Sequence, residues 1–201
     1  LRGLHDRAMN ASNDMGDRKD MLQEALMAQR QMLIAAIRTP GEEIPQAFTP
    51  YKEVLDVYDE GLELPDDVTI VWPDDNYGYM KRLSSPKEQK RSGRSGVYYH
   101  SSYLGKPHDH LWMNTTSPTL MYEELRKAYD TTADRIWLLN AGDIKSCEFA
   151  VDYFLTMAFD IDSFNFERAA NYRTEWLCGM LGNQYCNECR EDRKSTRLNS
   201  S

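Results

Sequence analysis

The stretch VTIVWPDDNYGYMKRL, residues 68–83, starts as an apolar segment and becomes polar within a few residues. Its first five residues, VTIVW, are β-branched or aromatic and do not alternate between apolar and polar side chains. This pattern is typical of a strand that is covered on both faces, as in a parallel sheet. Asp74, Asp75 and Asn76 follow, so the strand is predicted to end in a polar loop.

Strands and helices alternate on both sides of this stretch. Helices are predicted over residues 17–37, 52–62, 118–129 and 147–159, and strands over residues 43–51, 97–100 and 134–140. The repeat of roughly 30 residues fits parallel βαβ units. We therefore predict an α/β fold, a partial (β/α)8 barrel of the TIM type with about five strand–helix units. A doubly wound sheet is the alternative, but no glycine-rich phosphate-binding motif follows any strand.

Two of the predicted helices carry specific expectations. The helix that begins at Pro118 has Ser117 as its N-cap. Its buried stripe is predicted to consist of Met121, Leu125, Ala128 and Tyr129. The helix over residues 147–159 is predicted to bury one face made of Val151, Phe154, Leu155 and Ala158.

The pattern divides the chain into three parts. Residues 1–160 are predicted to form part of the barrel, and residues 161–190 the start of a separate helical domain. Residues 191–201 are expected to be a non-native or disordered tail, because they lack apolar periodicity. The chain starts with LRGLHD, which has the pattern of a strand end, so we expect it to be a fragment of a longer protein.

Composition limits the possible partners. A net charge of −8 over 201 residues argues against binding to nucleic acid or to an anionic membrane. No apolar run approaches the roughly 18 residues that a membrane span needs. Cys186 and Cys189 form a lone CxxC motif, whereas a zinc ribbon needs a second pair. The sequence therefore indicates neither a metal nor a cofactor.

The chemistry of a (β/α) barrel lies at the C-terminal ends of its strands. The polar residues predicted at these ends are Arg2, Tyr51, Glu53, Asp75, Asn76, His100, Tyr103, Asn140 and Asp143. Carboxylates, amides and aromatic rings together suit a sugar, whose hydroxyls need polar partners and whose ring face stacks on aromatics. The planar guanidinium of Arg2 suits a ligand carboxylate. An acidic sugar fits this combination.

Other interpretations of the same residues stay open. Asp74 and Asp75 are also suited to cap a following helix, and Glu53 to stabilise a helix N-terminus. A metal-dependent barrel hydrolase would use His100, His108, Asp109 and His110 as ligands. A non-catalytic domain that binds an acidic glycan would use the same aromatic residues and Arg2.

Three long segments, residues 44–83, 92–118 and 135–155, closely resemble the α-glucuronidases of glycoside hydrolase family 115. The resemblance implies a multidomain enzyme with a central (β/α) barrel. Such an enzyme removes glucuronic acid, often 4-O-methylated, from glucuronoxylan or its oligosaccharides, with inversion and without a cofactor. It also implies an exported protein, since xylan is extracellular. Whether the full-length protein is a homodimer is left open.

The resemblance also implies roles for individual residues. Glu53 is expected to act as acid or base, and Arg2, Tyr51, Asn76 and Tyr103 to bind the substrate. The loop after Arg2 departs from the family pattern at Leu4 and His5. Inversion needs two carboxyl groups about 6.5–9.5 Å apart. The second one is expected upstream of Leu1, with Asp75 as the alternative, so the chain alone is expected to be inactive.

Overall fold

The structure of the protein is a computed structural model that describes residues 14–37, 44–103, 105 and 116–191. Arg2 and the predicted first strand lie outside the described residues, as do His108, Asp109, His110 and residues 192–201 of the predicted tail. Within the described ranges, no helix is long and apolar enough to cross a bilayer.

Four strands form one sheet in the order of the sequence, which confirms the α/β prediction. They are β1 (Ala47–Phe48), β2 (Thr69–Pro73), β3 (Ser95–His100) and β4 (Ala133–Asn140). β1 pairs with β2 and β2 with β3, both in parallel. The backbone N–H groups of Ser95 and Ser101 donate to the carbonyl oxygens of Thr132 and Asn140, so β4 runs parallel to β3 as well.

The chain separates into two compact units. Unit 1 contains the described residues of 14–73 together with residues 82–98 and 131–136. Unit 2 contains residues 74–81 and the described residues of 99–130 and 137–191. β3 and β4 therefore begin in unit 1 and end in unit 2.

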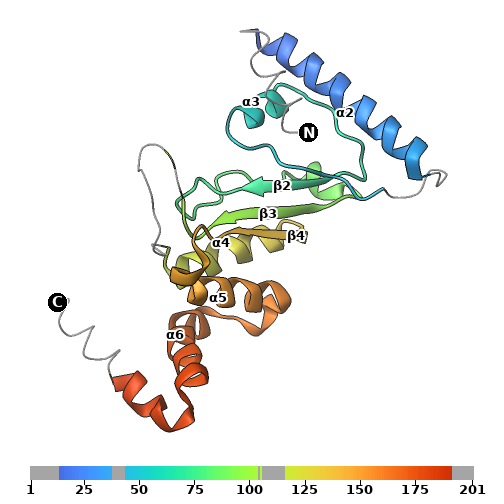
Figure 1. Ribbon diagram of the computed structural model, residues 1–201. Coiled ribbons are helices and arrows are strands. Elements are labelled where there is room, and N and C mark those ends of the chain that lie inside the picture. The colour runs from blue at the N-terminus through green and yellow to red at the C-terminus, as the bar shows by residue number, and fades with distance from the viewer. Residues whose placement is uncertain (1–13, 38–43, 104, 106–115, 192–201) are drawn as a thin grey trace. The chain divides into compact units, whose positions relative to one another are not determined.

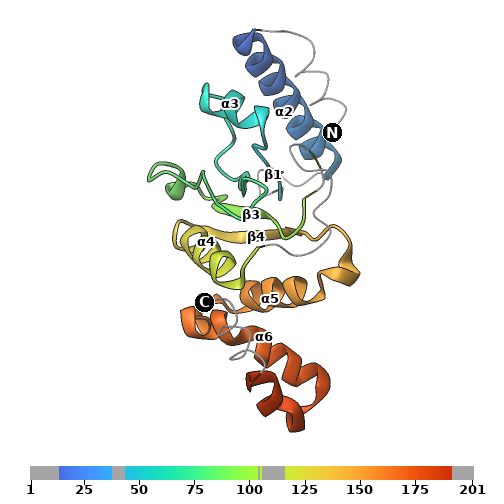
Figure 2. The same ribbon diagram turned by 90° about the vertical axis from the view of Figure 1, so that its left-hand side faces the viewer.

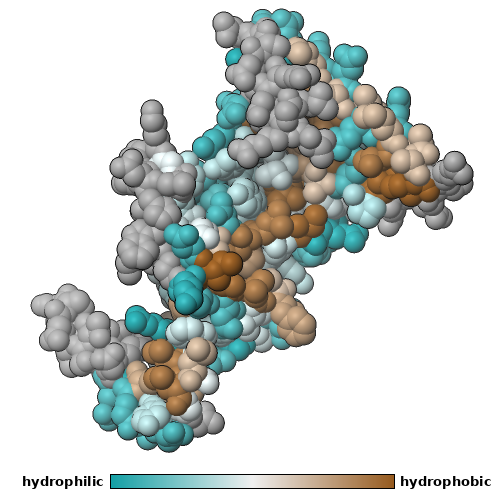
Figure 3. Space-filling model, viewed as in Figure 1, coloured by the Kyte–Doolittle hydropathy of each residue, from teal (hydrophilic) through white to brown (hydrophobic). Residues whose placement is uncertain are grey.

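Unit 1 has a core to which two helices, α2 (Met15–Ile37) and α3 (Glu53–Asp59), β1 and the segment before β2 contribute. Figure 1 shows α2 beside α3. The core residues are Leu22, Phe48, Val54, Val57, Leu62 and Val68. Ile70, Val71 and Trp72 of β2 are at most 1% exposed, which confirms that this strand is covered on both faces. Figure 3 shows hydrophobic residues on the surface of α2, where Met32, Ile34 and Ile37 are exposed.

The connection from β2 to β3 contains no α-helix, unlike an ordinary βαβ unit. Only a 3-10 turn, Glu88–Lys90, interrupts the irregular chain of residues 74–94. Pro86 and Gly93 disfavour a helix here. Asp74 and Asp75 consequently do not cap a helix, which rules out that interpretation.

In unit 2, the helices α4 (Pro118–Asp130), α5 (Glu148–Phe159) and α6 (Phe166–Leu181) pack on one another. Figure 2 shows α4, α5 and α6 close together, and α4 contacts α6 directly. The Ser117 hydroxyl accepts the backbone N–H of Leu120 at 3.2 Å, as the N-cap prediction requires. Met121, Leu125 and Ala128 are buried as predicted, whereas Tyr129 is partly exposed.

The predicted buried face of α5 was wrong. The buried residues are Ala150, Tyr153, Phe154 and Met157, while Leu155 is 56% exposed. Apolar side chains lie on every side of this helix, so their spacing does not fix the buried face. Tyr153 packs edge-on against Tyr172 of α6, with ring centroids 5.0 Å apart. Whether α6 begins a separate domain stays a prediction.

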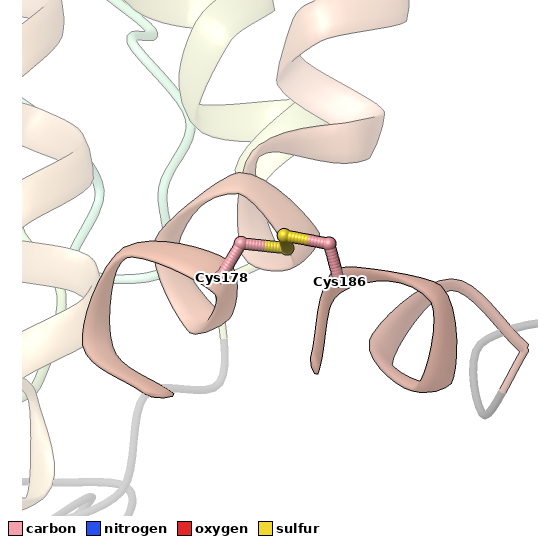
Figure 4. The surroundings of a disulfide bond; sticks show 2 residues. All are labelled: Cys178 and Cys186. Carbon is pink, nitrogen blue, oxygen red and sulfur yellow. A yellow bond between two sulfur atoms is a disulfide. The ribbon is translucent and has the colours of Figure 1, made fainter. Parts of the chain in front are cut away.

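A disulfide joins Cys178 of α6 to Cys186, with their Cα atoms 5.0 Å apart (Figure 4). Gly182 ends α6 with a φ of 101°, and its N–H donates to the carbonyl oxygen of Cys178. This glycine turn brings Cys186 back to the helix. Cys186 of the CxxC motif is therefore bonded outside the motif, and Cys189 is a free thiol.

Candidate active site

The loop that follows β2, residues 74–80, is held by hydrogen bonds to its own backbone. Oδ1 of Asp75 accepts the N–H groups of Tyr77 and Tyr79 at 3.0 and 3.2 Å. Oδ2 of Asp75 pairs with Lys81 at 3.2 Å. Asn76 has a left-handed φ of 71°, a conformation that asparagine tolerates better than most residues. The sequence DDNYGY thus builds a fixed turn with Asn76 at its tip.

Gly78 is clamped from both sides within this loop. Its N–H donates to Oδ2 of Asp74 at 3.1 Å, and its carbonyl oxygen accepts the hydroxyl of Tyr99 at 2.9 Å. Burial raises the pKa of Tyr99, and the charges of Asp74 and Glu124 raise it further, so this hydroxyl remains a donor. The loop ends where the N–H of Met80 donates to Glu124 of α4 at 2.7 Å.

His100, the last residue of β3, forms a buried pair with Asp74. Nδ1 of His100 lies 2.5 Å from Oδ1 of Asp74, and their side chains are 2% and 0% exposed. The backbone N–H of His100 also faces Oδ2 of Asp74, at 3.4 Å. The ring of His100 meets Tyr103 edge-on at 5.9 Å, and Tyr103 in turn contacts the ring of Tyr77 at 6.3 Å.

A second group of predicted site residues lies in unit 1, after β1. Tyr51 and Tyr98 of β3 pack edge-on, with ring centroids 6.0 Å apart. Glu53 is exposed and is the first residue of α3. Lys52, between Tyr51 and Glu53, has φ 52° and ψ −124°. The N–H of Val54 donates to the carbonyl oxygen of Tyr51. These are the features of a type II′ turn. Its first central residue, here Lys52, has a positive φ, and this position usually holds glycine.

The structure thus brings some of the predicted residues together. Asp75, Asn76, His100 and Tyr103 lie in unit 2, linked through Asp74 and Tyr77. Tyr51 and Glu53 lie together in unit 1, whereas Arg2 is outside the described residues. Both groups follow the C-terminal ends of strands in the chain. Their convergence at one rim stays a prediction, as do their individual roles.

Asn140 and Asp143, which follow β4, have structural features of their own. The carbonyl oxygen of Asn140 accepts the N–H of Ser101, and its side-chain oxygen accepts that of Gly142 at 3.3 Å. Asp143 is exposed at the start of a 3-10 turn. In the described part of the chain, no three His, Cys, Asp or Glu side chains are grouped so as to hold a metal.

Sequence reasoning missed the partnership of Asp74 with His100. Asp74 was weighed only with Asp75, as a helix cap or loop residue. One signal was present, since an aspartate directly follows one predicted strand and a histidine ends the next. Because parallel neighbours end at the same edge of a sheet, such a pair is placed to meet.

Comparison with known proteins bears on these residues directly. The sequence model of the family described as Glycosyl hydrolase family 115 matches residues 1–195. The chain belongs to glycosyl hydrolase family 115. The match includes Glu53, the loop after β2 and the buried pair of Asp74 and His100, and it confirms the resemblance seen in the three quoted segments.

A solved structure of a family 115 4-O-methyl-α-glucuronidase with specificity for decorated arabinogalactans is similar to this family 115 chain. The two are 37% identical, with a TM-score of 0.77 over 90% of this chain. This likeness and the parallel sheet identify the fold as part of a (β/α) barrel. The chain spans 24% of the length of that structure. Among curated proteins, no match to this chain is found.

Proposed function

We propose that this family 115 chain is part of an inverting α-glucuronidase that removes glucuronic acid, often 4-O-methylated, from a plant polysaccharide. One observation carries the proposal. Over 90% of this chain, a 4-O-methyl-α-glucuronidase has a similar fold and is 37% identical in sequence. The polar loop after β2 and the aromatic residues around His100 supply groups that suit a sugar ring and its hydroxyls.

The substrate we propose is glucuronoxylan or its oligosaccharides. A decorated arabinogalactan is the second candidate, because the similar solved enzyme has specificity for that class. The two polymers differ in their backbone sugars, whereas the terminal uronic acid is common to both. Residues that bind the uronic acid would therefore serve either substrate.

Glu53 is the residue to which we assign acid or base chemistry. It is exposed at the first turn of α3, where a proton can exchange with a ligand or with water. Tyr51, Asn76, Asp75, His100 and Tyr103 are proposed to bind the sugar, and Arg2 its carboxylate. The second carboxyl group that inversion requires is proposed to lie upstream of Leu1, and Asp75 remains the alternative.

We also propose that the full-length protein is exported. Its polymeric substrate is extracellular, and the disulfide between Cys178 and Cys186 supports an oxidising compartment. The free thiol of Cys147 is compatible with that compartment, because it is buried.

The test compares the full-length protein with its Glu53→Gln and Glu60→Gln variants on glucuronoxylan and on a glucuronic-acid-decorated arabinogalactan. Glu60 is an exposed carboxylate at the other end of α3 and controls for loss of charge. We expect uronic acid release by the wild type and by Glu60→Gln, and a loss of at least about 1,000-fold in Glu53→Gln. Release from only one polymer identifies the substrate.

Binding separates this proposal from a glycan-binding domain. We expect Glu53→Gln to retain the affinity for a glucuronoxylo-oligosaccharide, measured by calorimetry, while it loses turnover. Binding without turnover in the wild type would favour the non-catalytic domain. Undiminished activity in the presence of a chelator is expected, and its loss would favour the metal-dependent hydrolase. The 201-residue chain alone is expected to release no uronic acid.

A further inference from the structure

We propose that Asp74 is a positioning residue of the active site, which acts through His100 and through the loop that carries Asn76. This inference rests on the proposed function for its activity measurements, but not for its spectroscopic one. Asp74 directly follows β2, and its carboxylate is completely buried. A buried carboxylate is costly unless donors surround it.

The three donors around Asp74 come from two segments of the chain. Nδ1 and the backbone N–H of His100 approach at 2.5 and 3.4 Å, and the N–H of Gly78 approaches at 3.1 Å. One carboxylate therefore fixes the end of β3 and the far side of the loop 74–80 at once. A buried carboxylate contributes little net stability even when donors surround it, so its presence is better explained by placement than by stability.

The carboxylate also selects a state of the imidazole. We assign the proton of this contact to Nδ1 of His100, because an ionised carboxylate only accepts hydrogen bonds. In neutral histidine the lone pair then lies on Nε2, so that atom can only accept a hydrogen bond. A sugar hydroxyl can donate to such an atom. An orienting carboxylate of this kind acts on the ligand only through the ring it holds.

The same carboxylate controls the position of Asn76. The N–H of Gly78 binds Asp74 and its carbonyl oxygen binds Tyr99, so Gly78 is fixed on both sides. Asn76 lies two residues earlier, in a left-handed conformation within the turn closed by Asp75. Loss of the Asp74 contact would remove one of the two hydrogen bonds that hold Gly78 in place. The expected effect is a displaced Asn76 side chain.

The first test is spectroscopic and needs no activity. In the ¹⁵N-histidine-labelled chain, the signal of His100 is assigned by its absence in His100→Gln. We expect the neutral ring to be protonated on Nδ1 in the wild type, and to shift toward protonation on Nε2 in Asp74→Asn. A wild-type ring protonated on Nε2 would overturn the proposal. This result comes from the wild-type chain, with His100→Gln used only for assignment, so misfolding of Asp74→Asn does not remove the test.

The second test uses activity of the full-length protein. We expect Asp74→Asn to lower kcat/KM by about 100-fold, the loss typical of a misplaced group. We expect a smaller loss when Asp74→Asn is added to His100→Gln, because the route through the ring is gone and only the route through the loop of Asn76 remains. Equal losses in both backgrounds would indicate a merely structural residue. Glu123→Gln, an exposed carboxylate on α4, is the charge control and should retain activity.

If the full-length protein proves to have no glucuronidase activity, the proposed function fails, whereas the ring state still decides whether Asp74 positions His100. If activity is present and His100 is protonated on Nε2, the proposed function holds and the positioning role fails. The two failures are therefore distinguishable.

Discussion

Nδ1 of His100 and Oδ1 of Asp74 lie 2.5 Å apart in a position that solvent barely reaches. Asp74 follows β2 and His100 ends β3, so the pair ties together the ends of two parallel strands. The same carboxylate holds Gly78 and with it the loop that presents Asn76. A single buried charge thus connects the sheet with the residues proposed to bind the sugar.

Replacement of Gly78 by alanine is expected to destabilise the fold by roughly 2–4 kcal/mol. A Cβ at this position would lie 2.8 Å from the Tyr99 hydroxyl and 2.9 Å from a methyl group of Thr116, and its φ is 95°. Gly61 offers a matched control, because its φ is 99° and no atom lies within 4 Å of an added Cβ. Urea unfolding should show a clearly smaller loss for Gly61→Ala, and equal losses would contradict the account.

Lys52→Gly is expected to be more stable than Lys52→Ala by about 1 kcal/mol. Both variants lose the contact of the lysine ammonium with the Tyr51 ring, 5.1 Å from its centroid. They differ in their ability to adopt φ 52° and ψ −124° without strain, and we expect this to outweigh the greater flexibility of glycine in the unfolded chain. Thermal unfolding of the two variants measures that strain. If alanine is as stable as glycine, the turn before Glu53 is not strained.

The stability of unit 1 is expected to depend on Glu88 at acid pH. Burial opposes the ionisation of Glu88, but hydrogen bonds from Arg82 and Ser85 outweigh it and lower its pKa to about 2, from an ordinary value of 4.5. Because the folded state has the lower pKa, its stabilisation is complete above about pH 4.5. It is lost as the pH falls toward 2.

Glu88→Gln should therefore lose roughly 2 kcal/mol at pH 7. It should also lose less stability than the wild type between pH 4.5 and pH 2. Glu63→Gln, an exposed carboxylate in the same unit, is the control. Parallel acid profiles of the wild type and Glu88→Gln would show that Glu88 is not stabilised by its partners.

Loss of the disulfide is expected to destabilise the C-terminal part of unit 2. Cys178 and Cys186 are eight residues apart, and closing so short a loop contributes about 2–3 kcal/mol. Cys178→Ser should therefore lower the Tm, whereas Cys189→Ser should not, since Cys189 is a free thiol. Thiol titration of the unfolded, unreduced chain should detect two of the four cysteines. Four reactive thiols would show that the bond is absent.

Much of the fold could be predicted because its signals are local. VTIVW predicts a doubly covered strand, and Ser117 with Pro118 predicts the start of a helix, and both are confirmed. The buried face of α5 was predicted wrongly because its apolar residues surround the whole helix. The disulfide could not be predicted from spacing alone, since it depends on the reversal of the chain at Gly182.

The candidate site was predictable in part for the same reason. Its residue types follow strand ends, which the sequence reveals. The pair of Asp74 and His100 is separated by 26 residues, so it depends on which strands are neighbours. The interpretation of Asp74 as a helix cap failed because no helix follows it. Arg2, predicted to bind the substrate carboxylate, lies outside the described residues.

The most direct test of the account is proton NMR of the full-length protein acting on glucuronoxylan, with Glu53→Gln as the comparison. The account predicts that the wild type first releases the β-anomer of the uronic acid and that Glu53→Gln releases none. Release of the α-anomer would contradict inversion, and undiminished release by Glu53→Gln would contradict the role assigned to Glu53.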